Sequence, residues 1–442
     1  MAKLFGTDGV RGVAGELLTP ELAAALGRAA TLESSAARPQ VLLVRDTRES
    51  GPMLESALAA GIAGAGGDAL IAGVLPTPAA SVLIRRLGLD LAVVISASHN
   101  PWRDNGIKFF GTDGGKLDDE FEARIEASVV EAAQVGAASA KAPERAGHVR
   151  ELEGALDDYI RELTTSFRLD LAGVRVVLDC ANGAAYQAAP AIFERLGATV
   201  DLIAAEPDGR NINEGCGSTH PEALAARVAE TAADLGFAFD GDADRVVAVD
   251  ATGAVRDGDE LLALIARHLA GRGRLEGGVV VTVMSNYGFH NAMEEAEIEV
   301  ATTPVGDRSV SAELRRRHWS FGGEQSGHLI WTDFAPTGDG IAAALLTISA
   351  LEGTALADAR PMTRLPQILV NVHVADREAV ADATELWNAV ERENSALEGR
   401  GRVLVRPSGT EALVRVMVEA PKEAEAEAVA EKLVGIVERE LG

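Results

Sequence analysis

Short apolar runs alternate with longer helical segments along most of this chain, and this alternation constrains its fold more than any other feature. The runs are four to six residues long and rich in Val, Leu and Ile, which is typical of buried strands. In the first part of the chain we expect strands at 41–44, 69–74 and 91–95, and helices at 20–32, 54–63 and 78–87. Such an alternation predicts a mostly parallel sheet covered by helices on both faces, with ligands beyond the carboxyl ends of the strands.

The same pattern recurs twice and then changes to a shorter unit of strands and helices. We therefore predict an α/β protein with three consecutive α/β domains, whose sheets are mixed but mostly parallel, and a smaller C-terminal α+β domain, arranged around a central cleft. The expected domains are 1–153, 154–254, 255–366 and 367–442. Later elements that we expect include a helix at 221–235 before a strand at 237–239, and one continuous helix at 377–396.

Composition excludes several classes of partner. The formal net charge is −26, from 67 acidic and 41 basic residues, whereas a nucleic-acid-binding protein needs a basic face. No apolar run approaches the ~18 residues of a membrane-spanning helix, and residues 1–6 lack the apolar core of a signal peptide. Two cysteines, Cys180 and Cys216, are too few for a disulfide-rich secreted chain, so we expect free thiols. These features predict a cytoplasmic protein that contacts neither nucleic acid nor membrane.

A polar stretch follows the apolar run 91–95 and offers a candidate nucleophile. The sequence Ser-Ala-Ser-His-Asn-Pro, residues 96–101, ends the strand abruptly, so the chain is expected to leave the core there. Pro101 lacks an N–H and biases Asn100 toward an extended conformation, which places Ser98 on a turn or loop. A capped turn without chemistry would explain the same residues, because Ser and Asn bond readily to nearby backbone.

Three aspartates follow the expected strand at 237–239 and predict a metal site. In Asp240-Gly241-Asp242-Ala243-Asp244, alternate residues of an extended segment point to the same side, so the three carboxylates can converge. Their repulsion would be costly without a cation, and hard oxygen ligands favour Mg²⁺. The loop does not match an EF-hand, since its sixth residue is Arg245 and its twelfth is Ala251. An Asp-rich surface turn is the alternative interpretation.

Three further segments carry candidate binding residues. The glycine-rich octet 5–12 contains Arg11, the loop 321–328 contains Glu324, Ser326 and His328, and the segment 406–411 reads Arg-Pro-Ser-Gly-Thr-Glu. Residues 324, 326 and 328 are spaced so that they can share one face and meet sugar hydroxyls. The tight Ser-Gly-Thr turn, with Arg406 and Arg415 nearby, is a plausible phosphate cradle, although an ordinary hairpin connection would also explain it. The pair Arg45 and Arg48 is interpreted as exposed and is left outside the site.

These signatures together resemble the α-D-phosphohexomutase family. Residues 95–108 resemble its phosphoserine loop, 240–245 its metal loop, 321–328 its sugar loop and 406–411 its phosphate-docking loop, in the same order along the chain. The octet 5–12, the segment 303–309 and the Glu-Gln-Ser-Gly-His form of the sugar loop resemble the branch that acts on glucosamine phosphates, although Ser309 stands where an aromatic is expected. The activity implied is the interconversion of glucosamine 6-phosphate and glucosamine 1-phosphate, a small-molecule sugar phosphate.

The resemblance also implies roles for individual residues. Ser98 would carry the phosphoryl group and, through it, complete a Mg²⁺ site formed by Asp240, Asp242 and Asp244, and a hexose 1,6-bisphosphate would prime the enzyme. Lys108 is the first candidate for the proton-transferring group and His328 the second, while His99 orients the loop. Substrate contacts are expected from Arg11, Arg245, Glu324, Ser326, Arg406, Ser408, Gly409, Thr410 and Arg415.

Other functions stay open at this point. Asp-x-Asp also resembles the haloacid dehalogenase motif, in which Asp240 would be the nucleophile, but the fifth residue there is usually Thr or Val and here is Asp244. A catalytically silent sugar-phosphate-binding protein is a second alternative, although it should have lost the serine or an aspartate. Glucose and mannose phosphates are alternative substrates, because hydrogen bonding alone must discriminate among the sugars. A second copy of the chain, forming a homodimer, is the one protein partner that we consider.

Overall fold

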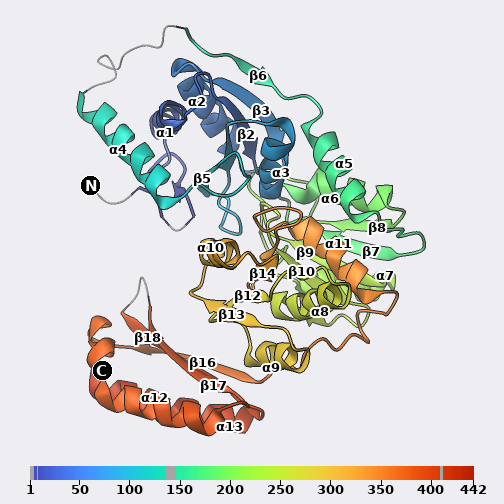
Figure 1. Cartoon of the computed structure of the whole chain (residues 1–442), viewed down its shortest axis with the longest axis vertical. Coiled ribbons are helices and arrows are strands. Elements are labelled where there is room, and N and C mark those ends of the chain that lie inside the picture. Colours follow the sequence, from blue (N-terminus) through green and yellow to red (C-terminus); the bar gives the residue numbers. More distant parts are fainter. Residues whose placement is uncertain (1–3, 7, 136–144, 409–411) are drawn as a thin grey trace. The chain divides into compact units, whose positions relative to one another are not determined.

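The computed structural model describes residues 4–6, 8–135, 145–408 and 412–442 (Figure 1). By the contacts among residues, the chain divides into two compact units. Unit 1 comprises Met1–Val283 and Ala301–Ala359, and unit 2 comprises Met284–Val300 and Arg360–Gly442. The predicted boundaries of four domains stay a prediction, because the two units do not test them.

The first sheet of unit 1 has six strands in the order β1-β5-β4-β2-β3-β6. Its strands are β1 (Val10–Val13), β2 (Gln40–Arg45), β3 (Asp68–Val74), β4 (Leu91–Ile95), β5 (Asp104–Phe110) and β6 (Val149–Glu151). Strand β2 runs parallel to β3 and β4, as predicted, whereas β5 turns back antiparallel to β4. The chain therefore leaves the core after Ile95 only briefly, and it re-enters the same sheet at Asp104.

Helices cover both faces of this sheet (Figure 1). They are α1 (Pro20–Glu33), α2 (Gly51–Gly64), α3 (Thr77–Leu87) and α4 (Asp119–Val135). Helix α1 begins as predicted, because the Thr19 hydroxyl accepts the Leu22 N–H at 3.3 Å. Side chains of α1, α2 and α4 share one core with alternate residues of β2, β4 and β5, including Ile107 and Phe109. Lys108 lies between those two in the strand and so faces the other side of the sheet, toward α3.

The second sheet of unit 1 has the order β11-β10-β9-β7-β8. Its elements are α5 (Ala155–Phe167), β7 (Arg175–Asp179), α6 (Ala185–Arg195), β8 (Thr199–Ile203), α7 (Glu222–Thr231), β9 (Leu235–Phe239), β10 (Val246–Asp250) and β11 (Val255–Arg256). The predicted helix 221–235 is too long at its C-terminal end. Ala232 takes a left-handed conformation with φ +49°, which ends α7, and Leu235 already belongs to β9.

The third sheet has the order β13-β12-β14-β15. Its strands are β12 (Val279–Thr282), β13 (Val300–Thr303), β14 (Phe321–Gly323) and β15 (Leu329–Trp331), and the helices of this part of unit 1 are α8 (Gly258–Gly271), α10 (Asp307–Arg317) and α11 (Gly340–Leu351). Strands β14 and β15 pair antiparallel, so the predicted sugar loop, 324–328, is the connection between them. All three sheets of unit 1 are mixed.

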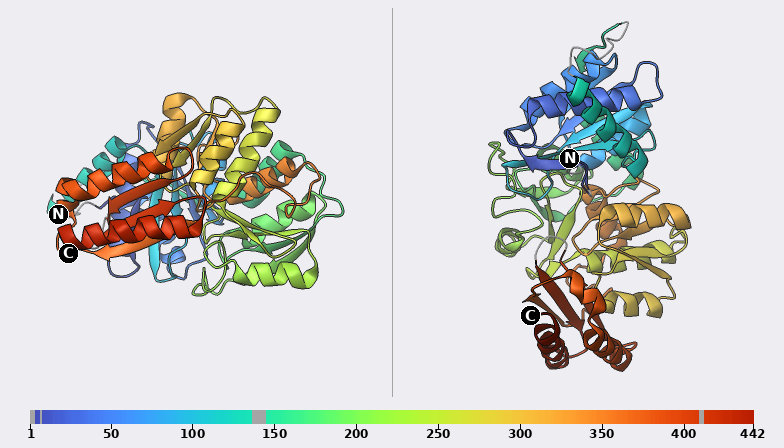
Figure 2. Two further views of the ribbon diagram at one scale, coloured as in Figure 1. Left: turned by 90° about the horizontal axis from the view of Figure 1, so that it is seen from below. Right: turned by 90° about the vertical axis from the view of Figure 1, so that its left-hand side faces the viewer.

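Unit 2 contains an antiparallel sheet of three strands in the order β16-β18-β17. Its elements are α9 (Tyr287–Glu295), β16 (Gln367–His373), the 3₁₀ helix η2 (Glu378–Asp382), α12 (Thr384–Leu397), β17 (Arg402–Pro407), β18 (Leu413–Glu419) and α13 (Glu423–Leu441). Alternate valines of the sheet form one core with α12 and α13, which cover that face (Figure 2). The predicted continuous helix 377–396 is wrong, because Ala383, with ψ 84°, separates η2 from α12.

The predicted fold class is confirmed: three mixed α/β sheets are followed by a small antiparallel C-terminal sheet with helices. Cys180 and Cys216 are buried and form no disulfide. Among the described residues, no helix combines the length and the apolar character that crossing a bilayer requires.

Candidate active site

Ser98 lies directly after β4 in a strained and buried position. Its φ is +51°, a left-handed conformation that costs a non-glycine residue about 1–2 kcal/mol, and only 1% of the residue is exposed. The hydroxyl donates a short hydrogen bond to Oδ2 of Asp240. A simple capped turn would need neither the strain nor the burial, so the geometry favours a functional serine.

Asp240, Asp242 and Asp244 follow β9 and converge as the sequence predicted. Each offers a carboxylate oxygen, these atoms lie within 4.8 Å of one another, and all three residues are buried. Burial raises the pKa of Asp240 well above its usual range, and the charges of Asp244 and Asp242 raise it further. Within the described part of the chain, Oδ1 of Asp242 and Oδ1 of Asp244 are buried without a hydrogen-bond partner. Buried carboxylate oxygens that lack donors are suited to a hard divalent cation, so the trio fits a Mg²⁺ site.

The loop of aspartates lies against the serine loop with no space between the two backbones. A Cβ atom added to Gly241 would lie 2.6 Å from the carbonyl oxygen of Ser98 and 2.8 Å from Nδ2 of Asn213. Only glycine allows this approach. The strand ends of the first and second sheets therefore bring the hydroxyl and the carboxylates together.

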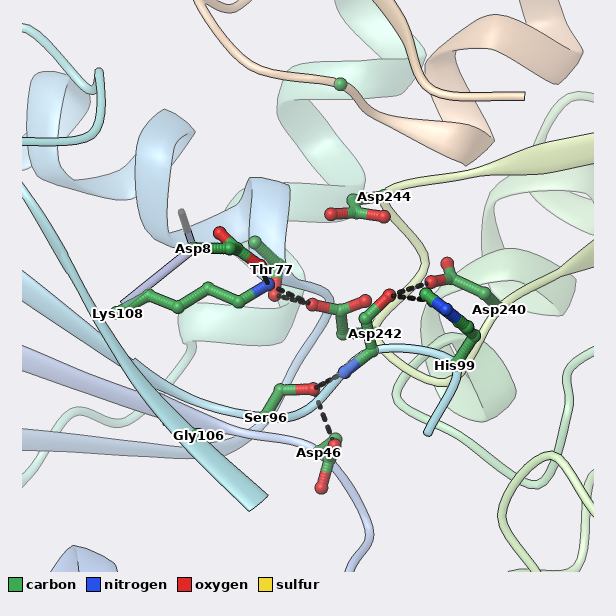
Figure 3. Close-up of polar contacts among 12 residues, drawn as sticks. Asp8, Asp46, Thr77, Ser96, His99, Gly106, Lys108, Asp240, Asp242 and Asp244 are labelled. Atoms are coloured by element: carbon green, nitrogen blue, oxygen red, sulfur yellow. Dashed lines mark hydrogen bonds and ion pairs between the residues drawn. The ribbon is translucent and has the colours of Figure 1, made fainter. Parts of the chain in front are cut away.

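Lys108 extends from β5 into the carboxylate cluster (Figure 3). Its Nζ lies 3.1 Å from Oδ2 of Asp242 and 3.0 Å from Oδ2 of Asp8. Burial alone would lower the pKa of this amine, but the charges of Asp242 and Asp8 raise it above the ordinary value. Lys108 is therefore held as an ammonium ion, and it compensates part of the negative charge of the aspartate cluster.

Two residues that hold this cluster, Thr77 and Asp8, were not predicted from the sequence. Thr77, at the start of α3, donates its hydroxyl to Oδ2 of Asp242 at 2.7 Å and its N–H to the Asp242 carbonyl at 2.9 Å. Asp8 lies in the octet that was singled out for Arg11, and it forms ion pairs with Arg11, Lys108 and Lys116. The glycine-rich context of the octet could have indicated Asp8, whereas no local signal pointed to Thr77.

Lys116 links this cluster to the third sheet. Its Nζ pairs with Asp8 and with Asp307, the first residue of α10. Burial raises the pKa of Asp307, but Lys116 and then His328 lower it to about 2 overall. A cavity of about 180 Å³ beside these residues is lined by Lys116, Asp307, Arg308, Arg315, His328 and Thr337, among others.

Arg11, His99 and Arg245 surround the serine and the aspartates. Arg11 pairs with Asp8, and its side chain keeps 29% of its surface exposed. The Nδ1 atom of His99 lies 3.4 Å from the Ser98 hydroxyl, and burial together with the charges of Arg245 and Arg11 lowers its pKa. The N–H of Arg245 bonds to Oδ1 of Asp240 at 3.1 Å. All three predicted site residues thus lie around Ser98 and the aspartates.

The predicted sugar loop does not have the geometry that its spacing suggested. The N–H of Gly327 bonds to the Glu324 carbonyl at 3.0 Å, so residues 324–328 form a tight turn and not an extended segment with one shared face. Glu324 accepts the Gly306 N–H at 3.0 Å, and the Ser326 hydroxyl is buried without a partner in the described structure. His328 is buried: its Nε2 accepts the Gly338 N–H at 3.1 Å and its Nδ1 lies 3.6 Å from Asp244.

The expectation for Arg48 was also wrong. Arg48 was interpreted as exposed, but its side chain is 0% exposed and it forms an ion pair with Asp46 at 2.9 Å. Arg45 is partly exposed, at 21%, and pairs with Glu55. Only tertiary contacts distinguish these two arginines, because both occur in the same short polar segment at the end of β2.

The predicted phosphate cradle lies in unit 2. Arg406 and Arg415 are paired opposite each other on neighbouring strands, on the face that the helices leave uncovered. Burial and the charge of Arg415 lower the pKa of Arg406. In the described residues, Nε of Arg415 is buried without a hydrogen-bond partner. Ser408 is buried and its carbonyl accepts Nη1 of Arg377 at 3.1 Å, while Gly409 and Thr410 lie outside the described residues.

Comparisons with known proteins agree on one family. Four models of the phosphoglucomutase/phosphomannomutase family match the chain in order: alpha/beta/alpha domains I, II and III at residues 2–135, 157–253 and 257–365, and the C-terminal domain at 369–436. A phosphoglucosamine mutase of Desulforudis audaxviator is 52% identical over 99% of this chain and 98% of its own length. Another, from Mycolicibacterium gilvum, is 50% identical over the full length of both chains.

Solved structures show the same fold. A crystal structure of a phosphoglucomutase/phosphomannomutase family protein from Burkholderia thailandensis, 25% identical, superposes with a TM-score of 0.83 over 99% of this chain and 97% of that one. An N-acetylphosphoglucosamine mutase from Aspergillus fumigatus, solved with GlcNAc-6P and magnesium, is 20% identical and has a TM-score of 0.65 over 98% and 95% of the two chains.

Proposed function

We propose that this chain, which belongs to the phosphoglucomutase/phosphomannomutase family, interconverts glucosamine 6-phosphate and glucosamine 1-phosphate through a phosphoserine at residue 98. The observation that carries the proposal is the buried Ser98 hydroxyl bonded to Asp240 within a cluster of three carboxylates. The relatives of about 50% identity supply the choice of sugar. The family assignment speaks against the alternative in which Asp240 is the nucleophile.

The chemistry of the donors favours a magnesium ion at the three aspartates. Asp240, Asp242 and Asp244 would hold the ion together with the phosphate on Ser98, and the bound ion would neutralise charge that develops on the phosphoryl group. The buried orphan oxygens on Asp242 and Asp244 support this assignment. The same residues could not remain ionised so close together without some cation.

In the first half-reaction, a hydroxyl oxygen of the sugar phosphate attacks the phosphorus on Ser98. The bond from phosphorus to the Ser98 oxygen breaks, the bond to the sugar oxygen forms, and the proton of the sugar hydroxyl ends on the Ser98 oxygen. A hexose 1,6-bisphosphate is the intermediate, and it turns around. In the second half-reaction the Ser98 hydroxyl attacks its other phosphorus, the bond from that phosphorus to the sugar oxygen breaks, and the serine proton ends on the sugar oxygen. The same bisphosphate primes an unphosphorylated enzyme.

Proton transfer needs a group near the serine, and Lys108 remains the first candidate and His328 the second. The two ion pairs of Lys108 hold it as an ammonium ion, so it is suited to stabilise negative charge in the transition state, although they also bind its proton more tightly. His328 touches Asp244 and is fully buried, which suits it less to contact with a sugar. His99 lies next to the serine hydroxyl and orients the loop.

The other predicted site residues are assigned to substrate contacts one by one. The phosphate that does not react docks at Arg406, Ser408, Gly409, Thr410 and Arg415. Arg406 and Arg415 lie opposite each other on neighbouring strands and supply two positive charges for this anion. Arg11 and Arg245 contact the phosphoryl group that is transferred, and Glu324 and Ser326 contact the sugar. The buried Ser326 hydroxyl without a partner supports its part in this assignment.

The decisive experiment compares kcat/KM for glucosamine, glucose and mannose 6-phosphates, with Mg²⁺ and a bisphosphate primer present. We expect glucosamine 6-phosphate to be preferred. A clear preference for one of the other sugars would overturn the substrate assignment and leave the mutase class intact. Binding of all three sugars without any turnover would favour the catalytically silent binding protein.

A further inference from the structure

We propose that Arg48 is a positioning residue, which holds the Ser98 loop in the conformation that presents the hydroxyl for phosphoryl transfer. The inference rests on the proposed function of Ser98. Arg48 lies in the segment that follows β2, the strand beside β4 in the sheet, and it makes no hydrogen bond to the hydroxyl itself. It acts through the backbone of the residues that follow β4.

Arg48 uses every donor of its guanidinium group. Five N–H bonds are available in an arginine side chain. Nε donates to Oδ2 of Asp46 at 2.9 Å, Nη1 donates to the Asp104 carbonyl at 2.9 Å and to the Pro101 carbonyl, and Nη2 donates to the carbonyls of Ser98 and Asn100, both at 2.8 Å. Four of the five acceptors are therefore carbonyls in the segment 98–104.

The partner of Arg48 holds the other side of the same serine. Oδ2 of Asp46 also accepts the Ser96 hydroxyl at 2.6 Å, and that hydroxyl oxygen accepts the Ser98 N–H at 2.9 Å (Figure 3). Arg48 thus fixes the carbonyl of Ser98, and Asp46 fixes its N–H through Ser96. Both polar backbone atoms of the strained residue are tied to one buried ion pair.

This arrangement explains why the left-handed conformation at Ser98 persists. A residue with positive φ relaxes unless the surrounding structure specifies it. Here the guanidinium group of Arg48, which is planar and has donors in fixed directions, specifies the conformation of Ser98. A lysine cannot reproduce it, since its ammonium group is one point charge with three donors. Asn213 adds one more bond to the Ser98 carbonyl, at 2.9 Å, from the second sheet. Loss of Arg48 leaves that bond and the bond from the Ser98 N–H to Ser96, and it removes the four bonds that Arg48 makes to carbonyls of the loop.

The consequence concerns rate and not affinity. Arg48 is enclosed by protein and makes its contacts to Asp46 and to the serine loop, so its replacement should leave substrate binding intact. A misplacement of the nucleophile by about 1 Å can cost on the order of 100-fold in rate. Arg48→Lys should therefore lower kcat by about 30- to 100-fold and change KM less than about threefold.

The test compares Arg48→Lys with Arg45→Lys, a matched substitution three residues away that keeps the pairing with Glu55. Both variants and the wild type are assayed for kcat and KM with glucosamine 6-phosphate. The single-turnover rate of Ser98 phosphorylation by glucose 1,6-bisphosphate is measured per folded molecule, with the folded fraction taken from thermal unfolding. We expect slow phosphorylation in Arg48→Lys, and in Arg45→Lys a rate within about twofold of the wild type.

Ser96→Ala provides a second route if Arg48→Lys does not fold. It removes one hydroxyl from the clamp, and we expect a loss of about fivefold to tenfold in kcat with unchanged KM. Equal phosphorylation rates in Arg48→Lys, Ser96→Ala and Arg45→Lys would overturn the proposal. So would a loss of activity that merely follows the folded fraction.

Hydrogen exchange separates this inference from the proposed function. Amide exchange across residues 96–104 should accelerate at least about tenfold in Arg48→Lys and not in Arg45→Lys, whether or not the protein turns over a sugar phosphate. Absence of mutase activity in the wild type would refute the proposed function alone. Unchanged exchange in Arg48→Lys would refute the role of Arg48.

Discussion

Two clusters of predicted site residues, one in each unit, differ in how far their charges are satisfied by the protein. In unit 1, Lys108, Thr77, Asp8 and Arg245 surround the aspartate loop, and most polar atoms there have partners. In unit 2, Arg406 and Arg415 face each other across two strands with like charges. Among the described residues, the first cluster leaves a few buried atoms without a hydrogen-bond partner, namely Oδ1 of Asp242 and Asp244, Nε of Arg11 and Arg245, and the Ser326 hydroxyl, whereas the second places two like charges on neighbouring strands.

This difference indicates a division of labour. A site that must hold reacting atoms to within a fraction of an ångström benefits from partners that are fixed before the substrate arrives. A site that only retains a phosphate gains from unpaired cations, because the anion itself completes the hydrogen bonding. Substitutions in unit 1 should therefore affect the rate of transfer, and substitutions in unit 2 should affect affinity.

Ser98→Ala is the most severe test of the unit 1 cluster, which we propose transfers the phosphoryl group. We expect turnover to fall by at least about 10⁴-fold, because no neighbouring hydroxyl can replace the nucleophile, and serine phosphorylation should disappear from the intact mass. Calorimetric affinity for glucosamine 6-phosphate should stay within about threefold of the wild type. Ser56→Ala, an exposed serine on α2, is the control. Full activity in Ser98→Ala would refute the phosphoserine mechanism.

Asp242→Asn tests the metal site in the same cluster. Removing one charge from the trio should abolish measurable Mg²⁺ binding in calorimetry and lower kcat by about 10²- to 10³-fold, while sugar-phosphate affinity changes little. Chelation of divalent ions should impose a comparable loss on the wild type, and Mg²⁺ should restore it. Asp170→Asn, an exposed aspartate, is the control. An unchanged affinity for Mg²⁺ would contradict the assignment of Asp242.

Arg406→Ala and Arg415→Ala test the unit 2 cluster, which we propose binds the phosphate that does not react. Each removes charged hydrogen bonds to the phosphate, worth about 1.5–3 kcal/mol, so KM should rise about 10- to 100-fold with a smaller effect on kcat. Arg439→Ala, an exposed arginine of α13 in the same unit, serves for comparison. If kcat fell while KM stayed constant, the division between the two clusters would be wrong.

The smallest expected effect is on protein stability, and it comes from the substitution Asp179→Asn. Within the part of the chain that the structure describes, the buried carboxylate of Asp179 accepts hydrogen bonds from the N–H groups of Ala181 and Gly217, and burial raises its pKa to about 6 in spite of them. Its unfolded value is about 3.9, so the protonated form is favoured in the folded protein. Stability relative to Asp179→Asn is then greatest below about pH 4 and is lost as the pH rises to about 6, by up to roughly 3 kcal/mol.

Thermal unfolding between pH 4 and 7 measures this difference. The melting temperature of the wild type minus that of Asp179→Asn should fall by a few degrees over the range and then level off. A carboxylate paired with a cation, such as Asp242, should show the opposite slope, since the charge of Lys108 lowers its pKa despite burial. A constant difference across the range would contradict the account given for Asp179.

The sequence predicted the centre of the site because its signals were local. Ser98 and the aspartates directly follow apolar strands, and the rule that ligands gather at strand ends brought them together. The strand that carries Lys108 was missed, since Asp104-Asn105-Gly106 has the composition of a turn. The break at Ala383 was missed for a similar reason, because neither Gly nor Pro marks it.

Contacts that depend on residues far apart could not be predicted. Thr77 and Asp307 reach the cluster only in the folded chain, and each is an ordinary polar residue in its own segment. Arg48 was misjudged because a charged residue is usually exposed, and this prior fails when one side chain finds five acceptors. The turn at Glu324–Gly327 similarly overrode the alternation that its spacing suggested.

The chain passes into the C-terminal unit twice, once for residues 284–300 and again from residue 360 onward. Within that unit, the Glu419 carboxylate receives the Tyr287 N–H at 2.9 Å and Nδ2 of Asn286 at 3.2 Å. A fragment of the chain that ends before residue 367 would therefore contain α9 without β18, the strand whose Glu419 binds the first turn of that helix. A separately expressed unit 2 must therefore include residues 284–300 as well as the residues from 360 onward.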